Sequence, residues 1–127
     1  MKRRNVLGTI ATVALSTVTA SAAAPVTQLH VDLLVEASHE AALKETYEKV
    51  FRPAIRKQPG FVDVQLMKFR VARAGNTPPA GAWRLMISFQ TEEQRQAWVA
   101  TDVHQKVWPQ MEKHLKMVNA LVYDPVA

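Results

Sequence analysis

Alternating apolar and polar residues predict a strand at residues 83–89, WRLMISF. Every second side chain there is apolar, which is typical of a strand with one packed face and one partly polar face. Thr91 follows as a candidate N-cap, and Gln94, three residues later, completes a capping-box pattern. Glu92 and Glu93 fall in the first turn, where the helix dipole favours negative charge. The pattern therefore predicts a strand followed directly by a helix.

The same alternation marks three further strands, at residues 27–36, 61–70 and 116–123. A loop at residues 73–81 is rich in turn-forming Gly, Asn and Pro, so the second and third strands are expected to form a hairpin. The apolar faces of the first two strands are formed by Leu29, Val31, Leu33 and Val35, and by Val62, Val64 and Leu66.

Helical spacing predicts two helical regions between the strands. The first begins with Ser38 as its N-cap and ends at Pro59–Gly60, and Pro53 should kink it or restart it as a final turn. The second region stops near Thr101, and Asp102 is expected to cap a further helical segment. The apolar stripe of the first region consists of Leu43, Tyr47, Val50, Phe51, Ala54 and Ile55.

The order β-α-β-β-α-β predicts an α+β fold of the ferredoxin-like plan, a four-stranded antiparallel sheet with its helices on one face. The other sheet face stays open and carries Leu34, Met67 and Met86 among polar groups. A monomer seldom leaves such an apolar patch in water. Two sheets are therefore expected to pair in a homodimer, which makes a dimeric α+β barrel with a cavity between the open faces.

Length, charge and cysteine content exclude several classes of protein. A chain of 127 residues is one domain by length. Three of its sixteen Lys and Arg residues are Lys2, Arg3 and Arg4, so the remaining thirteen exceed the eleven acidic residues by only two. This small excess gives no reason to expect nucleic-acid binding. The absence of cysteine excludes disulfides, thiolate catalysis and iron–sulfur clusters.

The first 22 residues have the pattern of an export signal. Lys2, Arg3 and Arg4 precede a short apolar stretch at residues 6–18, and Ala20-Ser21-Ala22 is an A-x-A cleavage pattern. The stretch is too short to span a bilayer, so no stable membrane insertion is expected after cleavage. The sequence thus predicts a signal at residues 1–22, a single domain at residues 23–127, and a periplasmic or secreted protein. A short N-terminal helix of a cytosolic protein is the alternative, and the arginine pair leaves both the twin-arginine and the general secretory route open.

Two segments resemble the antibiotic biosynthesis monooxygenase family: residues 51–61, FRPAIRKQPGF, and residues 89–104, FQTEEQRQAWVATDVH. The resemblance covers residues 28–123 and implies the dimeric α+β barrel fold. It also implies a homodimer that binds a small aromatic or quinone-like molecule and acts, where it is an enzyme, as a monooxygenase without metal, flavin or other cofactor. Members of the same superfamily also degrade haem or have no known activity, so a non-catalytic ligand-binding or stress protein is an alternative.

The haem-degrading relatives provide a residue-by-residue comparison. Trp98 matches the tryptophan that those enzymes carry in the second helix. Trp108 stands where they have a histidine, and His30 is the nearest counterpart of their first-strand asparagine. Two of the three roles are missing, so this resemblance implies no haem degradation. Haem binding through His104 remains a further alternative.

Two groups of residues are candidates for the site. On the predicted open face, Arg84 could stabilise a phenolate and His30 could take its proton, beside Asp32 and Gln65. The alternative is that these groups form ion pairs, His30 with Asp32 of a neighbouring subunit and Arg84 with Asp63.

The second group follows the predicted helix at residue 92. His104 is a candidate general base or axial haem ligand, with Trp98 and Trp108 as ligand-binding walls, or else a capping residue. No metal site is expected, because the four histidines show no ligand spacing. His39 and His114 are interpreted as helix-surface residues.

The export signal can be checked on protein isolated from its own host. N-terminal sequencing should give a first residue at or near Ala23, because the A-x-A pattern ends at Ala22. Recovery of Met1 on the folded protein would contradict the export signal.

Overall fold

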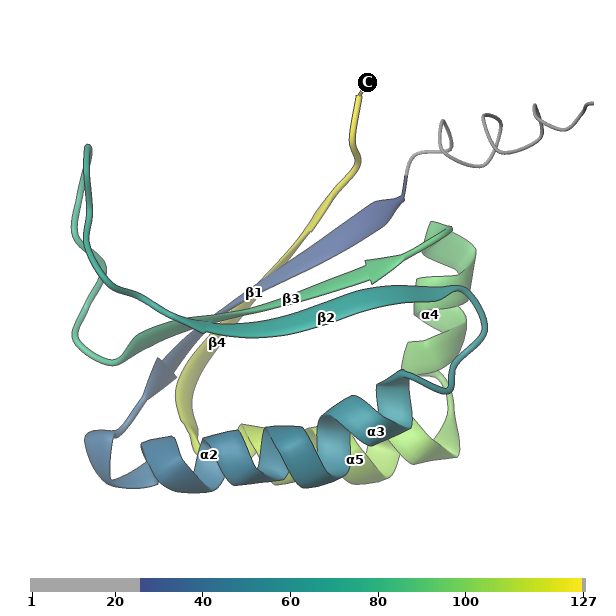
Figure 1. Ribbon diagram of the computed structural model, residues 1–127, viewed down its shortest axis with the longest axis horizontal. Helices are drawn as coiled ribbons and strands as arrows, with labels where there is room; N and C mark the ends of the chain where they lie inside the picture. Colours follow the sequence, from purple (N-terminus) through teal and green to yellow (C-terminus); the bar gives the residue numbers. More distant parts are fainter. Residues whose placement is uncertain (1–25, 127) are drawn as a thin grey trace, which may run out of the picture.

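The structure is a computed structural model that describes residues 26–126 of the chain. The predicted export signal therefore lies outside the described residues. Four strands form one antiparallel sheet in the order β2-β3-β1-β4 (Figure 1). The strands are β1 (Thr27–Val35), β2 (Phe61–Lys68), β3 (Ala82–Phe89) and β4 (Leu115–Tyr123). This confirms the predicted ferredoxin-like sheet.

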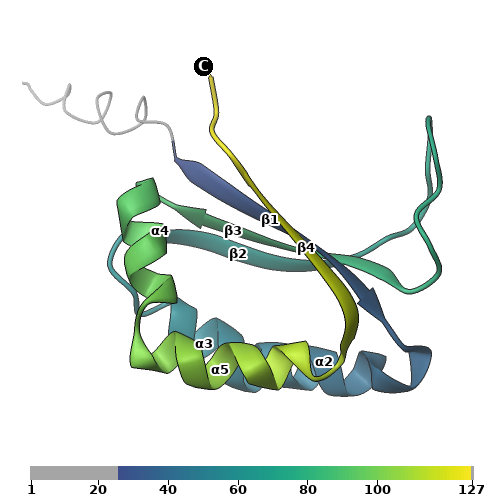
Figure 2. The ribbon, with the colours of Figure 1, turned by 180° about the vertical axis from the view of Figure 1, so that it is seen from behind.

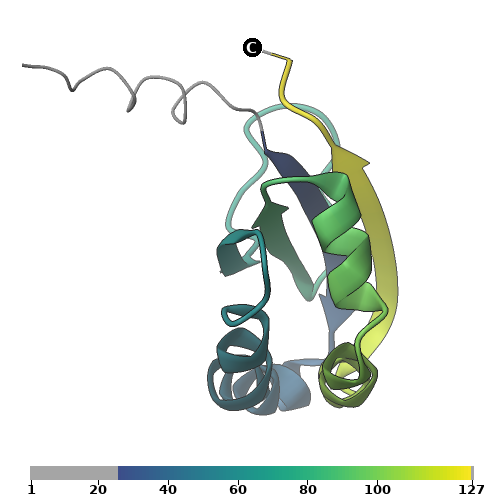
Figure 3. The ribbon, with the colours of Figure 1, turned by 90° about the vertical axis from the view of Figure 1, so that its right-hand side faces the viewer.

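The helices all lie on one face of this sheet, which leaves a two-layer molecule (Figures 1, 2 and 3). The first helical region is built from η2 (Ala37–His39), α2 (Glu40–Thr46), η3 (Tyr47–Phe51) and α3 (Arg52–Ile55). The second contains α4 (Glu92–Val99) and α5 (Asp102–Glu112). None of the helices between residues 26 and 126 has the length and apolar character needed to span a bilayer.

The core lies between the sheet and the helices, as strand alternation predicts. Leu33, Leu85 and Phe89 point from the sheet into this layer and are fully buried. Leu43 and Met111 meet them from the helices and are equally buried. Burying an aliphatic or aromatic side chain of this size contributes about 1.5–3 kcal/mol, so this layer supplies most of the driving force for folding.

Pro53 acts as predicted, by interrupting the first helical region. The chain widens into a π-helical turn at Tyr47–Phe51, in which the N–H of Arg52 donates to the carbonyl of Tyr47, and a short α-helix follows. In a regular α-helix, side chains four residues apart drift by about 40° around the axis per step. A wider turn reduces this drift, which keeps Tyr47, Phe51 and Ile55 on the buried face.

Threonines cap both helices of the second region. Thr91 Oγ1 accepts a hydrogen bond from the Gln94 N–H at 3.1 Å, as predicted, and Thr101 Oγ1 accepts one from the His104 N–H at 3.1 Å. The prediction of Asp102 as the second cap is wrong, because Asp102 is already the first residue of α5. The prediction of Ser38 as a cap is also wrong, since Ser38 lies inside the η2 turn and makes no capping bond.

Strand β4 is the most exposed strand of the sheet. All of its residues after Leu115 are exposed, including Val118 and Val122 on the helix side. Because β4 is an edge strand that pairs only with β1, the helices cover it incompletely. A second departure from the expected pattern is Val62, which is exposed because the β2–β3 register shifts between Phe61 and Asp63.

The capping bonds predict a difference between three alanine variants. Thr91→Ala and Thr101→Ala should each lower the free energy of unfolding by about 1 kcal/mol, because each leaves a helix N–H unpaired. Ser38→Ala is the matched control and should be neutral in urea denaturation. Equal losses in all three variants would contradict the capping roles.

Candidate functional site

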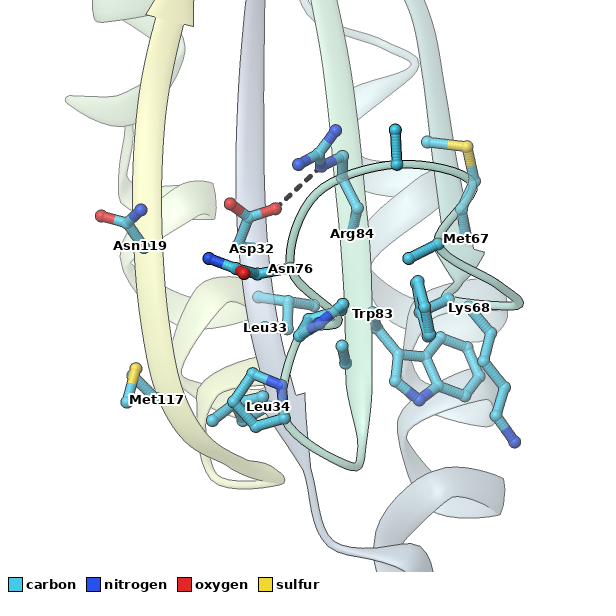
Figure 4. Close-up of a pocket in the computed structure, with 16 residues that line it drawn as sticks. Asp32, Leu33, Leu34, Met67, Lys68, Asn76, Trp83, Arg84, Met117 and Asn119 are labelled. Atoms are coloured by element: carbon cyan, nitrogen blue, oxygen red, sulfur yellow. Dashed lines mark hydrogen bonds and ion pairs between the residues drawn. The ribbon is translucent and has the colours of Figure 1, made fainter.

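A cavity of about 630 Å³ lies on the open face of the sheet beneath the β2–β3 hairpin loop (Figure 4). Leu34, Met67 and Met117 supply its apolar floor from three strands. Asn76 and the two prolines that follow it line the side formed by the loop. Asp32 and Arg84 are the candidate residues from the sequence that line this cavity.

Arg84 and Asp32 stand directly opposite each other on β3 and β1. The Arg84 Nε donates to Asp32 Oδ1 at 2.8 Å (Figure 4), and both side chains are about half exposed. The expected pairing of Arg84 with Asp63 is therefore wrong. Asp32 thus pairs with Arg84, and an exposed pair of this kind stabilises a fold by at most about 1 kcal/mol.

The other open-face candidates lie outside this cavity. His30 Nε2 is 3.1 Å from Gln28 Oε1, and the ring packs edge-on against Tyr123 with centroids 5.0 Å apart. Gln65 donates to Asp63 Oδ2 at 3.0 Å on the exposed surface. Thus one subunit brings Asp32 and Arg84 together but leaves His30 and Gln65 with local partners.

A smaller cavity, about 180 Å³ in volume, lies on the opposite side of the sheet, between the strands and the second helical region. It brings together three candidates that the sequence places on different elements: Trp98 from α4, and His104 and Trp108 from α5. The remaining lining residues are Leu29, Val31, Phe51, Leu85, Ile87, Arg95, Val99, Val118 and Ala120.

Aromatic contacts hold the walls of this helix-side cavity. The Trp98 ring meets His104 edge-on, with centroids 5.0 Å apart, and the Trp108 ring lies nearly parallel to that of His104, at 6.5 Å and 18°. Phe51 packs edge-on against both tryptophans, at 6.1 and 6.2 Å. These pairs have centroid distances within the range of favourable aromatic contacts, so His104, Trp98, Trp108 and Phe51 form one aromatic wall of the cavity.

The surroundings of His104 favour its neutral form. Burial lowers the pKa of its imidazole below the usual 6.5, because a charged ring would lose its hydration. Its Nδ1 is buried and has no hydrogen-bond partner within the described residues. The backbone N–H of His104 donates the capping hydrogen bond to Thr101, which fixes the position of the backbone that carries the imidazole.

Arg95 is a cavity residue that the sequence analysis missed. It lies one turn before Trp98 and forms a two-pronged ion pair with Glu92, Nε to Oε1 at 2.7 Å and Nη2 to Oε2 at 2.6 Å. This contact, helped by Gln96 and Thr27, lowers the pKa of the Glu92 carboxyl to about 2. The spacing of Glu92 and Arg95, three residues apart in a first helical turn, predicts the ion pair but not the cavity.

The expectation that His114 is a helix-surface residue is wrong, because His114 is buried, whereas His39 is exposed as expected and contacts it. Their Nδ1 atoms are 3.1 Å apart, and the other ring nitrogen of His114 lies 3.4 Å from Thr46 Oγ1. Burial first, and then the neighbouring His39 and Lys113, lower the pKa of His114. The pair connects the start of the first helical region to the residue before β4.

Neither a metal nor a haem finds a site among these residues. Within residues 26–126, no three His, Asp or Glu side chains are grouped so that they could hold a metal ion. The helix-side cavity has room for about one aromatic ring, whereas the haem macrocycle contains four pyrrole rings. His104 therefore lacks the space that an axial haem ligand needs, and the haem-binding alternative does not fit this structure.

Comparison with known proteins gives a match at the level of the fold. The sequence matches no protein-family model and no curated protein. Among solved structures, SnoaB, a cofactor-independent oxygenase from Streptomyces nogalater, is similar with a TM-score of 0.63 and 13% identity, over 83% of this chain and 96% of that one. A protein from Nitrosomonas europaea of unknown function gives 0.62 and 18%, over 82% and 92%.

A third structure extends the same similarity. It is a protein from Bordetella bronchiseptica, provisionally named an antibiotic biosynthesis monooxygenase, with a TM-score of 0.65 and 15% identity over 81% of this chain and 99% of that one. The resemblance that residues 51–61 and 89–104 indicate is thus confirmed in three dimensions. The chain has the fold of the antibiotic biosynthesis monooxygenase structures.

Proposed function

We propose that the mature domain binds a small phenolic or hydroquinone-like molecule in the helix-side cavity and oxidises it with O₂ without a cofactor. The observation that carries the proposal is a largely apolar cavity whose aromatic walls include an imidazole with a lowered pKa, His104. Ligand sites commonly combine apolar walls with a few placed polar groups. The similarity to a cofactor-independent oxygenase supports the reaction class.

The size of the cavity sets the size of the ligand. A dry apolar cavity of about 150 Å³ is known to bind benzene. The helix-side cavity, at about 180 Å³, therefore suits a single ring with small substituents. A polycyclic substrate would have to displace the exposed β4 wall at Val118 and Ala120.

The chemistry requires only the substrate, O₂ and a group that moves a proton. A hydroquinone that has lost a proton is electron-rich enough to reduce O₂ directly, and the neutral form of His104 can accept that proton. Conversion of the hydroquinone to a hydroxyquinone places one oxygen atom on the ring and releases the other as water. The ring supplies all four electrons, so neither a metal nor a flavin enters the balance.

Binding without turnover is the second candidate. Catalytic histidines are commonly oriented by a hydrogen bond to their second nitrogen. His104 Nδ1 has no such partner within the described residues, and this favours a simple binding role. Oxygen consumption separates the two candidates.

Oxygen uptake with a panel of monocyclic hydroquinones and no added cofactor tests the reaction. We expect turnover by the wild type, and a fall in kcat of about a hundredfold or more in His104→Phe, which removes the proton acceptor. Only the neutral ring can accept a proton, and its pKa lies below 6.5. The acid limb of the kcat/KM profile should therefore also lie below pH 6.5.

A cavity-filling variant provides the control for this test. Ala120→Phe should abolish both binding and uptake, since Ala120 lines the cavity. Ala100→Phe makes the same change at an exposed residue outside the lining and should retain both. Binding without oxygen uptake would leave the second candidate, and no binding by the wild type would exclude both.

We further propose that the protein is a homodimer joined through the open sheet face. Four large side chains on this face are substantially exposed in the single chain: Met67 by 37%, Met117 by 58%, Leu121 by 40% and Tyr123 by 54%. Sheets that pack face to face bury such residues in a layer about 10 Å thick. The larger cavity would then lie at the interface between the subunits.

Light scattering at micromolar concentration should report a dimer. Leu121→Glu, which places a charge at the centre of the proposed interface, should shift the protein to a monomer. Val103→Glu is the matched control, because Val103 is comparably exposed, at 42%, but lies on α5 in the helix layer. A wild-type monomer would contradict the proposed interface.

A further inference from the structure

Among the described residues that line the helix-side cavity, Arg95 is the only one with a permanent charge. His104 becomes charged only when its ring gains a proton. We infer that Arg95 binds the hydroxyl oxygen of a phenolic ligand and stabilises the phenolate when the proton leaves. This inference rests on the proposed function, which it extends by assigning a residue to the ligand's oxygen and by defining the ligand class.

The proton transfer needs such a group. A phenol ordinarily has a pKa near 10, whereas a histidine starts near 6.5, and burial lowers the pKa of His104 further. The pKa of the phenol therefore exceeds that of the histidine by more than about three units, which makes the transfer unfavourable unless the cavity stabilises the phenolate. A hydrogen bond donated to the charged form of an acidic group lowers its pKa, so an N–H of Arg95 can supply part of the difference even though Glu92 balances the guanidinium charge.

The geometry leaves part of Arg95 available for a ligand. Its side chain is only 15% exposed, and its Nε and Nη2 are both committed to Glu92. Nη1 makes no hydrogen bond within residues 26–126. Since a guanidinium is planar and rigid, the contact with Glu92 also fixes the direction in which the remaining N–H groups point.

The neighbouring carboxylates restrict the ligand class. Glu92 neutralises Arg95, and Thr27 Oγ1 links this pair to Asp124, lying 3.5 Å from Glu92 Oε1 and 3.0 Å from Asp124 Oδ1. The group as a whole thus carries no net positive charge that would draw an anion in from solution, and Arg95 acts on a bound ligand only through a directional hydrogen bond. A ligand that enters neutral and ionises in place, a phenol, suits this arrangement better than an aromatic carboxylate.

The step balances as a simple proton transfer. The O–H bond of the phenol breaks, its proton moves to a ring nitrogen of His104, and the electron pair stays on the phenol oxygen. Arg95 donates a hydrogen bond to that oxygen before and after the transfer, and the bond strengthens as negative charge develops.

The experiment uses two probes of nearly equal shape, 4-nitrophenol and 4-nitrotoluene, with the full-length mature protein. The absorbance of 4-nitrophenol reports its ionisation, so one titration gives both its affinity and its bound pKa. We expect the wild type to lower the pKa of bound 4-nitrophenol by about one unit or more. Arg95→Met should weaken 4-nitrophenol binding by about ten- to a hundredfold, the loss typical of a hydrogen bond to a charged group.

The matched probe shows whether the cavity survives the substitution. Binding of 4-nitrotoluene should be unchanged in Arg95→Met, and Arg95→Lys, which keeps the charge, should restore part of the pKa shift. Equal loss of both probes, or no loss of either, would overturn the role of Arg95 and leave the cavity as the binding site. If the wild type binds neither probe, the proposed function fails together with this inference.

Discussion

The structure depends on one contact, the burial of the inner face of the sheet against the apolar stripe of the helices. Leu33, Leu85 and Phe89 meet Leu43 and Met111 there, and all five are almost completely buried. The strands obtain their register from this contact, since a slip of one residue would turn every one of these side chains outward. The helix-side cavity is the part of the same layer that the contact does not fill.

Bulky aromatic side chains explain why the layer is incomplete. Trp98 and Trp108 line the cavity from the second helical region, and the smaller side chains of Val118 and Ala120 line it from β4 and stay exposed. An incompletely packed region costs stability through lost dispersion contacts. A ligand of one ring would restore those contacts, so the same side chains that weaken the packing also provide affinity.

Much of the fold follows from local patterns, and less of the site does. Alternation at residues 83–89 and the Thr91–Gln94 pattern predict β3 and the start of α4, because neighbouring residues determine both. Trp98, His104 and Trp108 could be proposed from helical spacing and family resemblance. Arg95 could not, and neither could the contact between His39 and His114, because each depends on how separate elements pack. The Ser38 prediction failed for a related reason, since an extra turn displaced the helix start.

Two imidazoles, His114 buried and His104 partly buried, make the stability of the fold depend on pH. His104 and His114 both have pKa values lowered by burial, so the unfolded chain, whose histidines keep their ordinary values near 6.5, binds protons more readily. As the pH falls below about 6.5, protonation of these histidines therefore favours the unfolded chain. Above that pH, they make no further change to the free energy of unfolding. His114 contacts His39 where the first helical region begins and β4 follows. Acid therefore destabilises the packing between the two layers at this contact.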